Sequence, residues 1–500
     1  MSYIYGAAVQ GIQQFIFQTN ELKDIVGASE LVEEICGDRF IKLLIELGIF
    51  DEDCTIINAA GNIKYEFKKR EDCEKVVRLF PKMVVELAPG ITISQAVVAY
   101  EESNSFVDAI NELERRLRAQ RNKPMASITV GLMGIKRSHK TNMPVVEINC
   151  QDYLDQATLN KRNASKGNTL QLSRKAFGDD TLKIKNLAID PKQMTQRNDW
   201  VAVIHADGNG LGQIVQKIGT NRVLFKDFSR KLDRATTEAA IAAYDDVEQD
   251  WKRIPIRPIV LGGDDFTIIC RADIALEYAT SFIKHFERKT AELLGEIICG
   301  KKGTQQVFSE GEVRDRLTAC AGIAYVKSSY PFYYAYELAE ALCSRAKKDA
   351  KNKDSIREGK EIAPSCIMFH KVQDSFVESY EEIAHRELEL ADERTFEFGP
   401  YYINGTKEGR WDVDTLVSKA KLIEMKGKDG NAVKSHLRNW MSLMKEGNTG
   451  MAEQKLKRVK NIVTDRELQE LVECATTGKR IPAYDILTIH TINTQQTKED

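Results

Sequence analysis

The sequence predicts an α+β fold in which one order of strands and helices occurs twice and a helical region follows. Apolar runs of strand length alternate with longer stretches of helical periodicity in the order β-α-β-β-α-β, with one trailing helix, within residues 1–120 and again within residues 199–355. This order is typical of ferredoxin-like domains, in which helices cover one face of an antiparallel sheet. We therefore expect two ferredoxin-like domains and a helical C-terminal domain.

The second copy contains the more distinctive residues. Its predicted elements are, in order, a buried strand (Trp200–Ala206), a glycine-rich turn (Asp207–Gly212), a long helix (Phe225–Val247), a hairpin (Ile259–Cys270), an amphipathic helix (Ile274–Glu292), a strand (Leu317–Val326) and a final helix (Tyr334–Lys351). The hairpin has Gly-Gly-Asp-Asp at its tip, between two apolar runs.

The first copy shows the same order without the acidic residues. We predict, in order, a strand (Tyr3–Val9), a helix (Ala28–Leu47), a hairpin (Thr55–Phe67), a helix (Glu71–Leu87), a strand (Ile91–Tyr100) and a helix (Ser105–Ala119). The tip of its hairpin, Ala59–Asn62, reads Ala-Ala-Gly-Asn, and the position that corresponds to Asp207 lies close to Val9. We interpret the first copy as a degenerate relative of the second.

These patterns divide the chain into four parts. We expect the degenerate domain at residues 1–122, an insert at 123–198, the domain with Gly-Gly-Asp-Asp at 199–377 and the helical domain at 378–500. The insert is predicted to be irregular with a few strands, because short apolar runs at Ile128–Leu132 and Val145–Ile148 accompany a polar tract at Asn160–Asn168.

The C-terminal part has helical periodicity in four segments, Leu416–Lys426, Asn431–Met444, Gly450–Val463 and Asp465–Ala475. The last seven or so residues are polar, and we expect them to be disordered.

Composition excludes several classes of protein. The net charge of −2 means that the average surface is not a nucleic-acid footprint. Ten scattered cysteines show no C-x-x-C spacing, so neither a zinc ribbon nor a thioredoxin-type motif is predicted. The start lacks the pattern of a secretory signal, and no apolar run reaches the ~18 residues of a membrane span. We expect a cytoplasmic protein with no membrane segment.

The hairpin tip, Asp264 and Asp265, and the end of the neighbouring strand, Asp207, provide three carboxylates that we expect to converge. Mg²⁺ and Mn²⁺ prefer such oxygen ligands, and a pair of these ions activates a 3′-hydroxyl and neutralises a leaving pyrophosphate. The alternative is an ordinary hairpin turn, in which Gly and Asp are favoured for backbone reasons. A third carboxylate on the adjacent strand favours the metal site.

Phosphate groups have a candidate cradle beside these acids. The loop between the strand of Asp207 and a helix is rich in glycine, which lets backbone N–H groups approach phosphates. It is neither a Walker A motif nor a Rossmann fingerprint. Lys347, on the last helix of the second copy, is a candidate cation for the β- and γ-phosphates, although solvated helix lysines are common. The expected nucleotide-binding residues are Gly208, Asn209, Gly210, Leu211, Gly212, Gly262, Gly263 and Lys347.

These motifs resemble the large polymerase-like subunit of type III CRISPR effector complexes, which makes cyclic oligoadenylates. In the second copy the resemblance rests on His205–Gly212, on Leu261–Phe266, and on Leu317–Lys327 with the helix that reaches Lys347. In the first copy it rests on three segments, Gln10–Phe17, Leu22–Lys23 and Gly27–Leu31. Together they span about the first 370 residues. The second copy is more distantly similar to GGDEF diguanylate cyclases.

The resemblance implies two palm domains, the first degenerate, and a helical C-terminal domain. It implies that ATP binds across the palm pair and that 3′–5′ phosphodiester bonds form with release of pyrophosphate, in antiviral defence. Asp207, Asp264 and Asp265 match the metal-binding catalytic carboxylates of the family, residues 208–212 its phosphate loop, and Lys347 its phosphate-contacting lysine. The implied partners are subunits of a CRISPR RNA complex, target RNA as activator, and a downstream effector that binds the product.

Two departures from the family pattern limit this expectation. The chain has no His-Asp dipeptide, so we do not expect the HD nuclease that many members carry. The insert keeps only Cys150 of the family's four-cysteine zinc module, so we do not expect zinc. A stand-alone relative is therefore an open alternative. So are a catalytically silent RNA- or protein-binding scaffold and a GGDEF-like cyclase that uses GTP or mixed nucleotides.

Overall fold

The structure is a computed structural model, and it describes most of the chain. The described residues are 2–59, 61–101, 106–123, 134–149, 152–166, 170–178, 181–195, 199–218, 222–249, 251–299, 315–352, 363–374, 378–404 and 409–494. Several predictions fall wholly or partly outside them, namely the strand at Ile128–Leu132, the zinc-module cysteine Cys150 and the disordered C-terminal residues.

The N-terminal part is a four-stranded antiparallel sheet with the order β2-β3-β1-β4. The strands are β1 (Ser2–Gln10), β2 (Thr55–Ala59), β3 (Asn62–Phe67) and β4 (Thr92–Tyr100). The helical segments are α1 (Ile12–Ile16), α2 (Leu22–Glu34), a π-helical segment (Ile35–Arg39), α3 (Phe40–Glu46), a 3₁₀ turn (Glu52–Cys54), α4 (Arg70–Leu87) and α5 (Phe106–Arg121).

The central part contains a six-stranded sheet with the order β12-β11-β10-β7-β9-β8. Its strands are β7 (Trp200–Gly208), β8 (Ile256–Gly262), β9 (Asp265–Arg271), β10 (Ala319–Lys327), β11 (Cys366–Lys371) and β12 (Tyr401–Tyr402). Its helices are α10 (Leu211–Ile218), α11 (Arg222–Val247), α12 (Ala272–Cys299), α13 (Phe332–Ala350) and α14 (Tyr380–Glu387).

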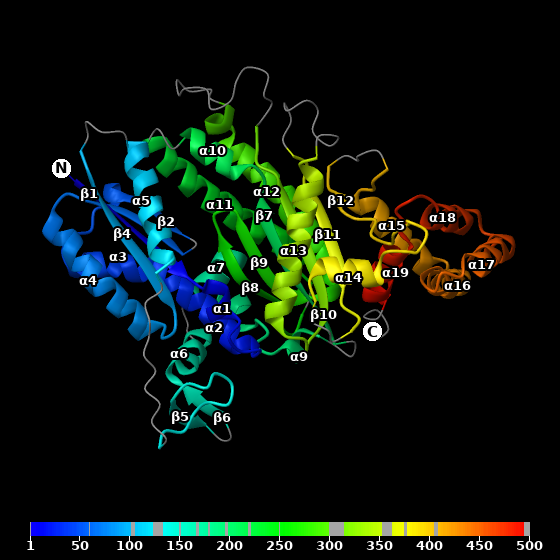
Figure 1. Cartoon of the computed structure of the whole chain (residues 1–500), viewed down its shortest axis with the longest axis horizontal. Coiled ribbons are helices and arrows are strands. Elements are labelled where there is room, and N and C mark those ends of the chain that lie inside the picture. Colours follow the sequence, from blue (N-terminus) through cyan, green and yellow to red (C-terminus); the bar gives the residue numbers. More distant parts are fainter. Residues whose placement is uncertain are drawn as a thin grey trace.

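The two sheets repeat one topology, as the sequence predicts. The order β8-β9-β7-β10 in the central sheet corresponds to β2-β3-β1-β4 in the N-terminal sheet. The predicted α+β class is confirmed, and Figure 1 shows the two sheets side by side with the C-terminal helices beyond the second. The central sheet is larger than expected, because β11 adds to β10 in parallel and β12 follows it.

Both faces of the central sheet are covered. Along β7 and β10 nearly every residue is buried, whereas β4 of the N-terminal sheet has exposed and half-buried residues between its buried ones. Phe266 of β9 stacks on Phe282 of α12 with ring centroids 4.0 Å apart, so α11 and α12 cover one face. Helix α13 covers the other face, where Tyr336 packs edge-on against His205 of β7.

The insert differs from the irregular segment that we expected. Besides the hairpin of β5 (Val145–Asn149) and β6 (Asp152–Asp155), it contains four helices among its described residues, α6 (Gln156–Ser165), α7 (Gln171–Phe177), α8 (Thr181–Lys185) and α9 (Pro191–Met194). The polar tract at Asn160–Asn168 begins inside α6.

Distant partners explain why α6 is helical and why Lys161 and Arg162 are buried in it. Arg162 pairs with Asp24 of α2 at 2.8 Å, and Lys161 donates a hydrogen bond to the carbonyl oxygen of Phe15 at 2.6 Å. The Asp155 carboxylate caps the helix by accepting the N–H of Thr158 at 3.0 Å. Because buried charges are stable only when paired, the tract folds against the first domain, a contact that local composition does not reveal.

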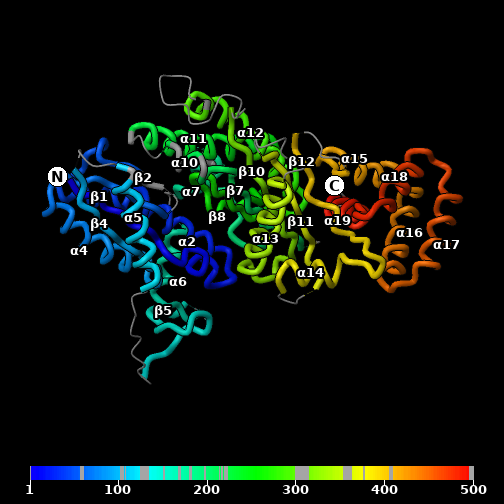
Figure 2. Tube along the Cα trace, turned by 45° about the horizontal axis from the view of Figure 1, so that its top comes forward, coloured from blue at the N-terminus to red at the C-terminus, as the bar shows by residue number. Residues whose placement is uncertain are grey.

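After α14, the described residues of the C-terminal part form the four helices that were predicted and one more, α19. They are α15 (Val413–Met425), α16 (Gly427–Lys445), α17 (Thr449–Ile462), α18 (Arg466–Thr476) and α19 (Ala483–Thr494). Helix α19 is buried on nearly all sides, so it lacks the polar face on which the prediction relied. Figure 2 shows α16–α19 gathered at the end of the molecule opposite β1. Among the described helices, none is both long and apolar enough to cross a bilayer.

Substitution of Gly322 in β10 tests how closely α13 packs on this strand. A Cβ added there would lie 2.0 Å from the carbonyl oxygen of Ala339 in α13, so the helix lies directly on the strand. We expect Gly322→Ala to lower the free energy of unfolding by about 1–3 kcal/mol, as overpacking does. Urea denaturation of the purified chain measures this. In Gly450→Ala, which places a Cβ in open space within α17, stability should not fall. Equal stability of Gly322→Ala and wild type would show that α13 does not pack this closely on β10.

Candidate active site

The tip of the central hairpin is a two-residue turn. Gly262 and Asp265 pair across it, and Gly263 adopts φ of +61°, a conformation that favours glycine. This places Gly263 first in a turn of the primed type, which matches the twist of the flanking strands. Thr236 of α11 donates a hydrogen bond to the carbonyl oxygen of Gly263 at 2.5 Å. The turn therefore presents Asp264 and Asp265 from a fixed backbone.

Asp207 comes from the end of β7, beside this turn. The register of β7 and β9 pairs Ala206 with Phe266, so one further step places Asp207 opposite Asp265. Gly208 brings the two backbones together, because a Cβ there would lie 3.0 Å from the Cβ of Asp264. The structure thus brings together the three carboxylates that the sequence singled out. One oxygen of each lies within 4.8 Å of the others, in the only such group of three among the described residues.

Burial, and then mutual repulsion, raises the proton affinities of the two tip residues. Partial burial, followed by the charges of Asp265 and Asp207, raises the pKa of Asp264 to about 7. Desolvation and the charge of Asp207 raise the pKa of Asp265 to about 6, although water reaches this side chain and the Lys347 ammonium opposes the rise. The cluster is therefore short of positive charge near neutral pH.

Lys347 supplies one cation to the cluster. Its ammonium forms an ion pair with Asp207 and donates a hydrogen bond to the carbonyl oxygen of Gly208 at 3.0 Å. The lysine lies near the end of α13, and the close approach of that helix to Gly322 sets its position. Lys347 thus reaches the site, but in this structure it contacts the carboxylate that the sequence assigned to a metal.

The glycine-rich loop divides into two functional parts. Asn209 faces inward, because its N–H donates to the carbonyl oxygen of Thr318 at 2.7 Å and its amide nitrogen contacts the Thr318 hydroxyl at 3.2 Å. Its side chain therefore anchors the loop instead of facing a ligand. Gly210 has φ of +75° and α10 begins at Leu211. The first N–H groups of α10 have no partners within the helix and are suited to anions.

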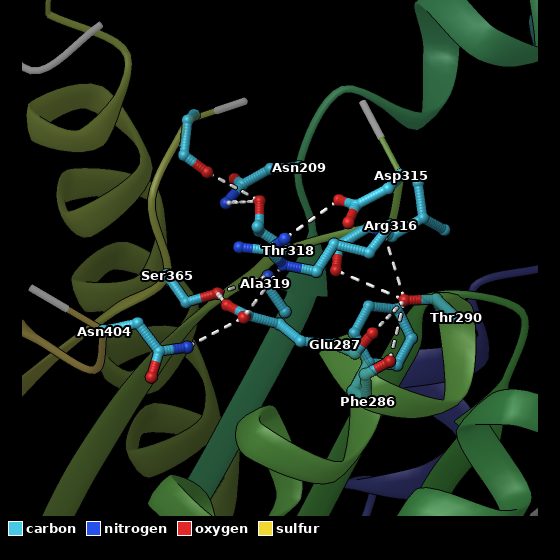
Figure 3. A network of polar contacts seen from close by, with 12 residues as sticks. Asn209, Phe286, Glu287, Thr290, Asp315, Arg316, Thr318, Ala319, Ser365 and Asn404 are labelled. Atoms are coloured by element: carbon cyan, nitrogen blue, oxygen red, sulfur yellow. Dashed lines mark hydrogen bonds and ion pairs between the residues drawn. The ribbon is translucent and has the colours of Figure 1, made fainter. Parts of the chain in front are cut away.

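Figure 3 shows the polar network that holds this anchor. Thr318 donates to the carbonyl oxygen of Ala363 at 2.6 Å, and Ser365 accepts the N–H of Ala319 at 3.1 Å. The buried carboxylate of Glu287 on α12 accepts the Ser365 hydroxyl at 2.5 Å and the Asn404 amide at 2.8 Å. The network ties the loop to both β10 and the residues before β11.

The first domain contributes to a small cavity beside Asp265. The cavity has a volume of about 140 Å³ and is lined from the first domain by Ile12, Gln13 and Gly61, and from the second by His205, Asp265 and Tyr336, among others. Gln13 donates a hydrogen bond to the Tyr336 hydroxyl at 2.7 Å. Burial lowers the pKa of His205 to about 4, so its ring is neutral near pH 7.

Sequence patterns did not identify Gln13, Thr236, His205 or Tyr336 as site residues. Each acts through a partner that is distant in the chain, such as Tyr336, which lies 323 positions from Gln13. The signal that was available for His205 was its place two residues before Asp207 on a buried strand, where an ionisable side chain is uncommon.

The corresponding place in the N-terminal sheet has no carboxylates. Ala59 pairs with Asn62 there as Gly262 pairs with Asp265, and Ala8 pairs with Asn62. By this register Ala8 corresponds to Asp207, one residue before the expected position near Val9. The structure therefore supports the interpretation of the first domain as a copy without the acids.

The three carboxylates fit a divalent cation. They supply hard oxygen donors from two rigid backbones, and the raised pKa values of Asp264 and Asp265 show that added positive charge at this place is favourable. These are the ligands that Mg²⁺ and Mn²⁺ prefer. Among the described residues no corresponding group of cysteines and histidines exists for zinc.

Removing one charge from the cluster should stabilise the metal-free protein. Because the folded pKa of Asp264 is raised to about 7 from its ordinary 3.8, the folded protein loses stability as the pH rises through that window. We expect Asp264→Asn to unfold at the same temperature as wild type below about pH 4 and a few degrees higher above pH 7, in the presence of chelator. Added Mn²⁺ should reverse this order.

Thermal unfolding across pH tests this expectation, with Asp245→Asn, an exposed aspartate of α11, as the control. A variant that is less stable than wild type at pH 8 without metal would contradict the assignment of repulsion to the cluster.

Comparison with known proteins identifies a similar domain family for part of the chain. Residues 200–357 match the family model for the second palm domain of Cas10/Cmr2. A comparison with curated protein sequences finds no match.

Solved structures resemble the whole chain in fold. A chain of the Csm1–Csm4 cassette in complex with cA3 aligns with a TM-score of 0.58 and 16% identity, over 98% of this chain and 69% of that one. The apo cassette gives a TM-score of 0.56 at 15% identity, and the cassette with one ATP gives 0.55 at 16%, each over 98% of this chain and 70% of the other. Residues 200–357 thus resemble the second palm domain of Cas10/Cmr2, and the chain as a whole has a fold similar to that of a chain of the Csm1–Csm4 cassette.

Proposed function

We propose that the chain is a metal-dependent nucleotidyltransferase that joins ATP into 3′–5′ linked, linear or cyclic oligoadenylates. The observation that carries the proposal is the group of three carboxylates at the edge of a Cas10/Cmr2-type palm, one oxygen of each within 4.8 Å of the others, with Lys347 beside them. Relatives of similar fold were solved with cA3 and with ATP, which supports the choice of nucleotide.

The reaction forms one bond and breaks one. The 3′-oxygen of one nucleotide bonds to the α-phosphorus of the next, the bond between the α-phosphorus and the bridging oxygen breaks, pyrophosphate leaves, and the 3′-hydroxyl proton passes to solvent. A pair of Mg²⁺ or Mn²⁺ ions held by Asp207, Asp264 and Asp265 would supply charge stabilisation for the attacking and leaving oxygens. The fixed turn at Gly263 keeps the tip carboxylates in place, so little reorganisation is needed during the reaction.

Cationic and backbone donors are placed to receive the triphosphate. The N–H groups at the start of α10 lie directly after Gly210, and an anionic phosphate is favoured at such a helix N-terminus. Lys347 now pairs with Asp207, and it would be free to contact the β- and γ-phosphates if that carboxylate held a metal. Gly262 and Gly263 keep the tip free of side chains where the nucleotide passes.

The cavity between the two domains is a candidate base site. It borders Asp265, so a base held there lies within a nucleotide's length of the reacting phosphates. Gln13 and the neutral His205 offer hydrogen-bonding groups, and Tyr336 offers an aromatic ring. The degenerate first domain thus contributes lining residues to the pocket, whereas the catalytic carboxylates come from the second domain.

We further propose that the chain works in the cytoplasm within RNA-guided antiviral defence. The solved structures of similar fold are Csm1–Csm4 cassettes, which supports a neighbouring complex subunit as partner. The proposal also includes target RNA as activator and a downstream effector that binds the product.

The proposal predicts that Asp264→Ala/Asp265→Ala abolishes turnover, because the remaining Asp207 cannot hold a metal pair. We expect wild type incubated with ATP and Mn²⁺ or Mg²⁺, with and without target RNA, to release pyrophosphate and form oligoadenylates that mass spectrometry identifies. Turnover should fall at least 100-fold in the double variant and remain in the control Asp245→Ala. Equal turnover by wild type and the double variant would rule out catalysis at this site.

A catalytically silent scaffold is the second candidate. The observation that favours it is the ion pair between Lys347 and Asp207, which neutralises one carboxylate without a metal. A scaffold should bind ATP without turnover, and Asp207→Ala should leave its function in cells unchanged. The catalytic proposal expects the opposite for Asp207→Ala, namely loss of cellular function with ATP binding weakened less than tenfold. Equilibrium titration with a non-hydrolysable ATP analogue measures the binding.

Competition among the four nucleoside triphosphates decides between ATP and GTP as substrate.

A further inference from the structure

A second cavity lies between the central sheet and the C-terminal helices. It has a volume of about 820 Å³, within the range of sites that hold small ligands. Its lining comes from the ends of β7, β10 and β11, from the segment that precedes α13, and from α16 and α19. None of the residues assigned above to the active site lines it.

The sheet brings three of the lining residues to one place. In the register of the antiparallel pair, Lys327 at the end of β10 lies opposite Trp200 at the start of β7. In the parallel pair, Lys371 at the end of β11 lies opposite Tyr325, two residues before Lys327 and hence on the same face. The two ammonium groups lie 4.3 and 4.4 Å from the centroid of the Trp200 ring.

This place is remote from the carboxylates. Trp200 and Asp207 are the two ends of one strand, seven residues and therefore about 23 Å apart. An odd separation along a strand also puts the two side chains on opposite faces of the sheet. A ligand in this cavity would not compete with a nucleotide at the hairpin tip.

Positive charge dominates the lining. Lys327, Lys371 and Arg438 line the cavity against one carboxylate, Asp374, which pairs with Arg386 at 2.6 Å. Burial, and then the charges of Lys327 and Arg438, lower the pKa of Lys371 to about 8. Asp199 is the acidic group that acts on Lys327. Lys371 is half-buried, whereas Lys327 and Arg438 are exposed. Like charges held together at the cavity favour the entry of an anion.

The remaining lining favours an anion that carries a planar group. Tyr330 and Tyr484 are half-buried aromatic residues in the same cavity, and Gln373, which donates to the Tyr484 hydroxyl at 3.0 Å, also lines it. Arg438 offers a planar guanidinium, which matches phosphate oxygens better than an ammonium does. We infer that this cavity binds a phosphate ligand of mononucleotide to dinucleotide size, with its phosphates at Lys327, Lys371 and Arg438.

Fluorescence of Trp200 provides the test, because phosphates that draw the two lysines from its ring should change its emission. The full chain is titrated separately with a non-hydrolysable ATP analogue, a short oligoadenylate, a longer single-stranded RNA and inorganic phosphate. We expect saturable binding of the ATP analogue or the short oligoadenylate, weakened at least tenfold in Lys371→Gln and in Arg438→Gln, and unchanged in Lys457→Gln, an exposed lysine of α17. The signal should be lost in Trp200→Phe, with binding retained by calorimetry.

The outcomes separate the possible ligands. Tighter binding of the longer RNA than of the short oligoadenylate, or binding of inorganic phosphate as tight as that of the nucleotides, would overturn the inferred ligand size. Equal affinities of wild type and Lys371→Gln would overturn the site itself. Pyrophosphate release by Lys371→Gln without added ligand should match that of wild type, so a failure here is distinguishable from failure of the catalytic proposal.

Discussion

Close passage of two backbones at the edge of the central sheet is the constraint on which the site depends. Gly208 passes the Asp264 side chain at a distance that leaves no room for a Cβ without displacement. Only this approach lets the end of β7 and the tip of the next hairpin share one group of carboxylates. The same proximity forces like charges together, and burial together with this repulsion raises the pKa values of Asp264 and Asp265. The central sheet is well packed and buried on both faces, and the stability of this packing offsets the unfavourable free energy of the clustered carboxylates.

The first domain shows what the scaffold looks like without this constraint. It has the same strand order and the same hairpin pairing, yet Ala8 and Asn62 occupy the places of Asp207 and Asp265. With no acids to hold, its hairpin tip is available for another contact, and Gly61 lines the cavity between the domains. The repeat therefore has a division of roles. One copy gathers charge, and the other closes the pocket next to it.

Sequence reasoning found what is encoded locally. Apolar runs predicted the four strands that the two sheets share, and Gly-Gly-Asp-Asp with Asp207 identified the acidic group, because turn chemistry and strand ends depend on neighbouring residues. It missed what depends on distant partners. The helix α6 was predicted to be irregular, since Arg162 looks like a solvated residue until Asp24 is brought to it. Helix α19 and strand β11 were missed because buried elements have no polar face to give a period.

The ion pair between Lys347 and Asp207 links the order of binding events to electrostatics. Without metal, Lys347 is the cation that lowers the repulsion among the three acids, and it also accounts for the pKa of Asp265 being lower than it would otherwise be. A metal that approached alone would displace the Lys347 ammonium toward Asp265, which is itself a proposed metal ligand. A metal that arrives with a triphosphate brings a separate anion, so the lysine exchanges one negative partner for another. At the proposed metal site, this ion pair would therefore favour entry of metal and nucleotide together over entry of metal first.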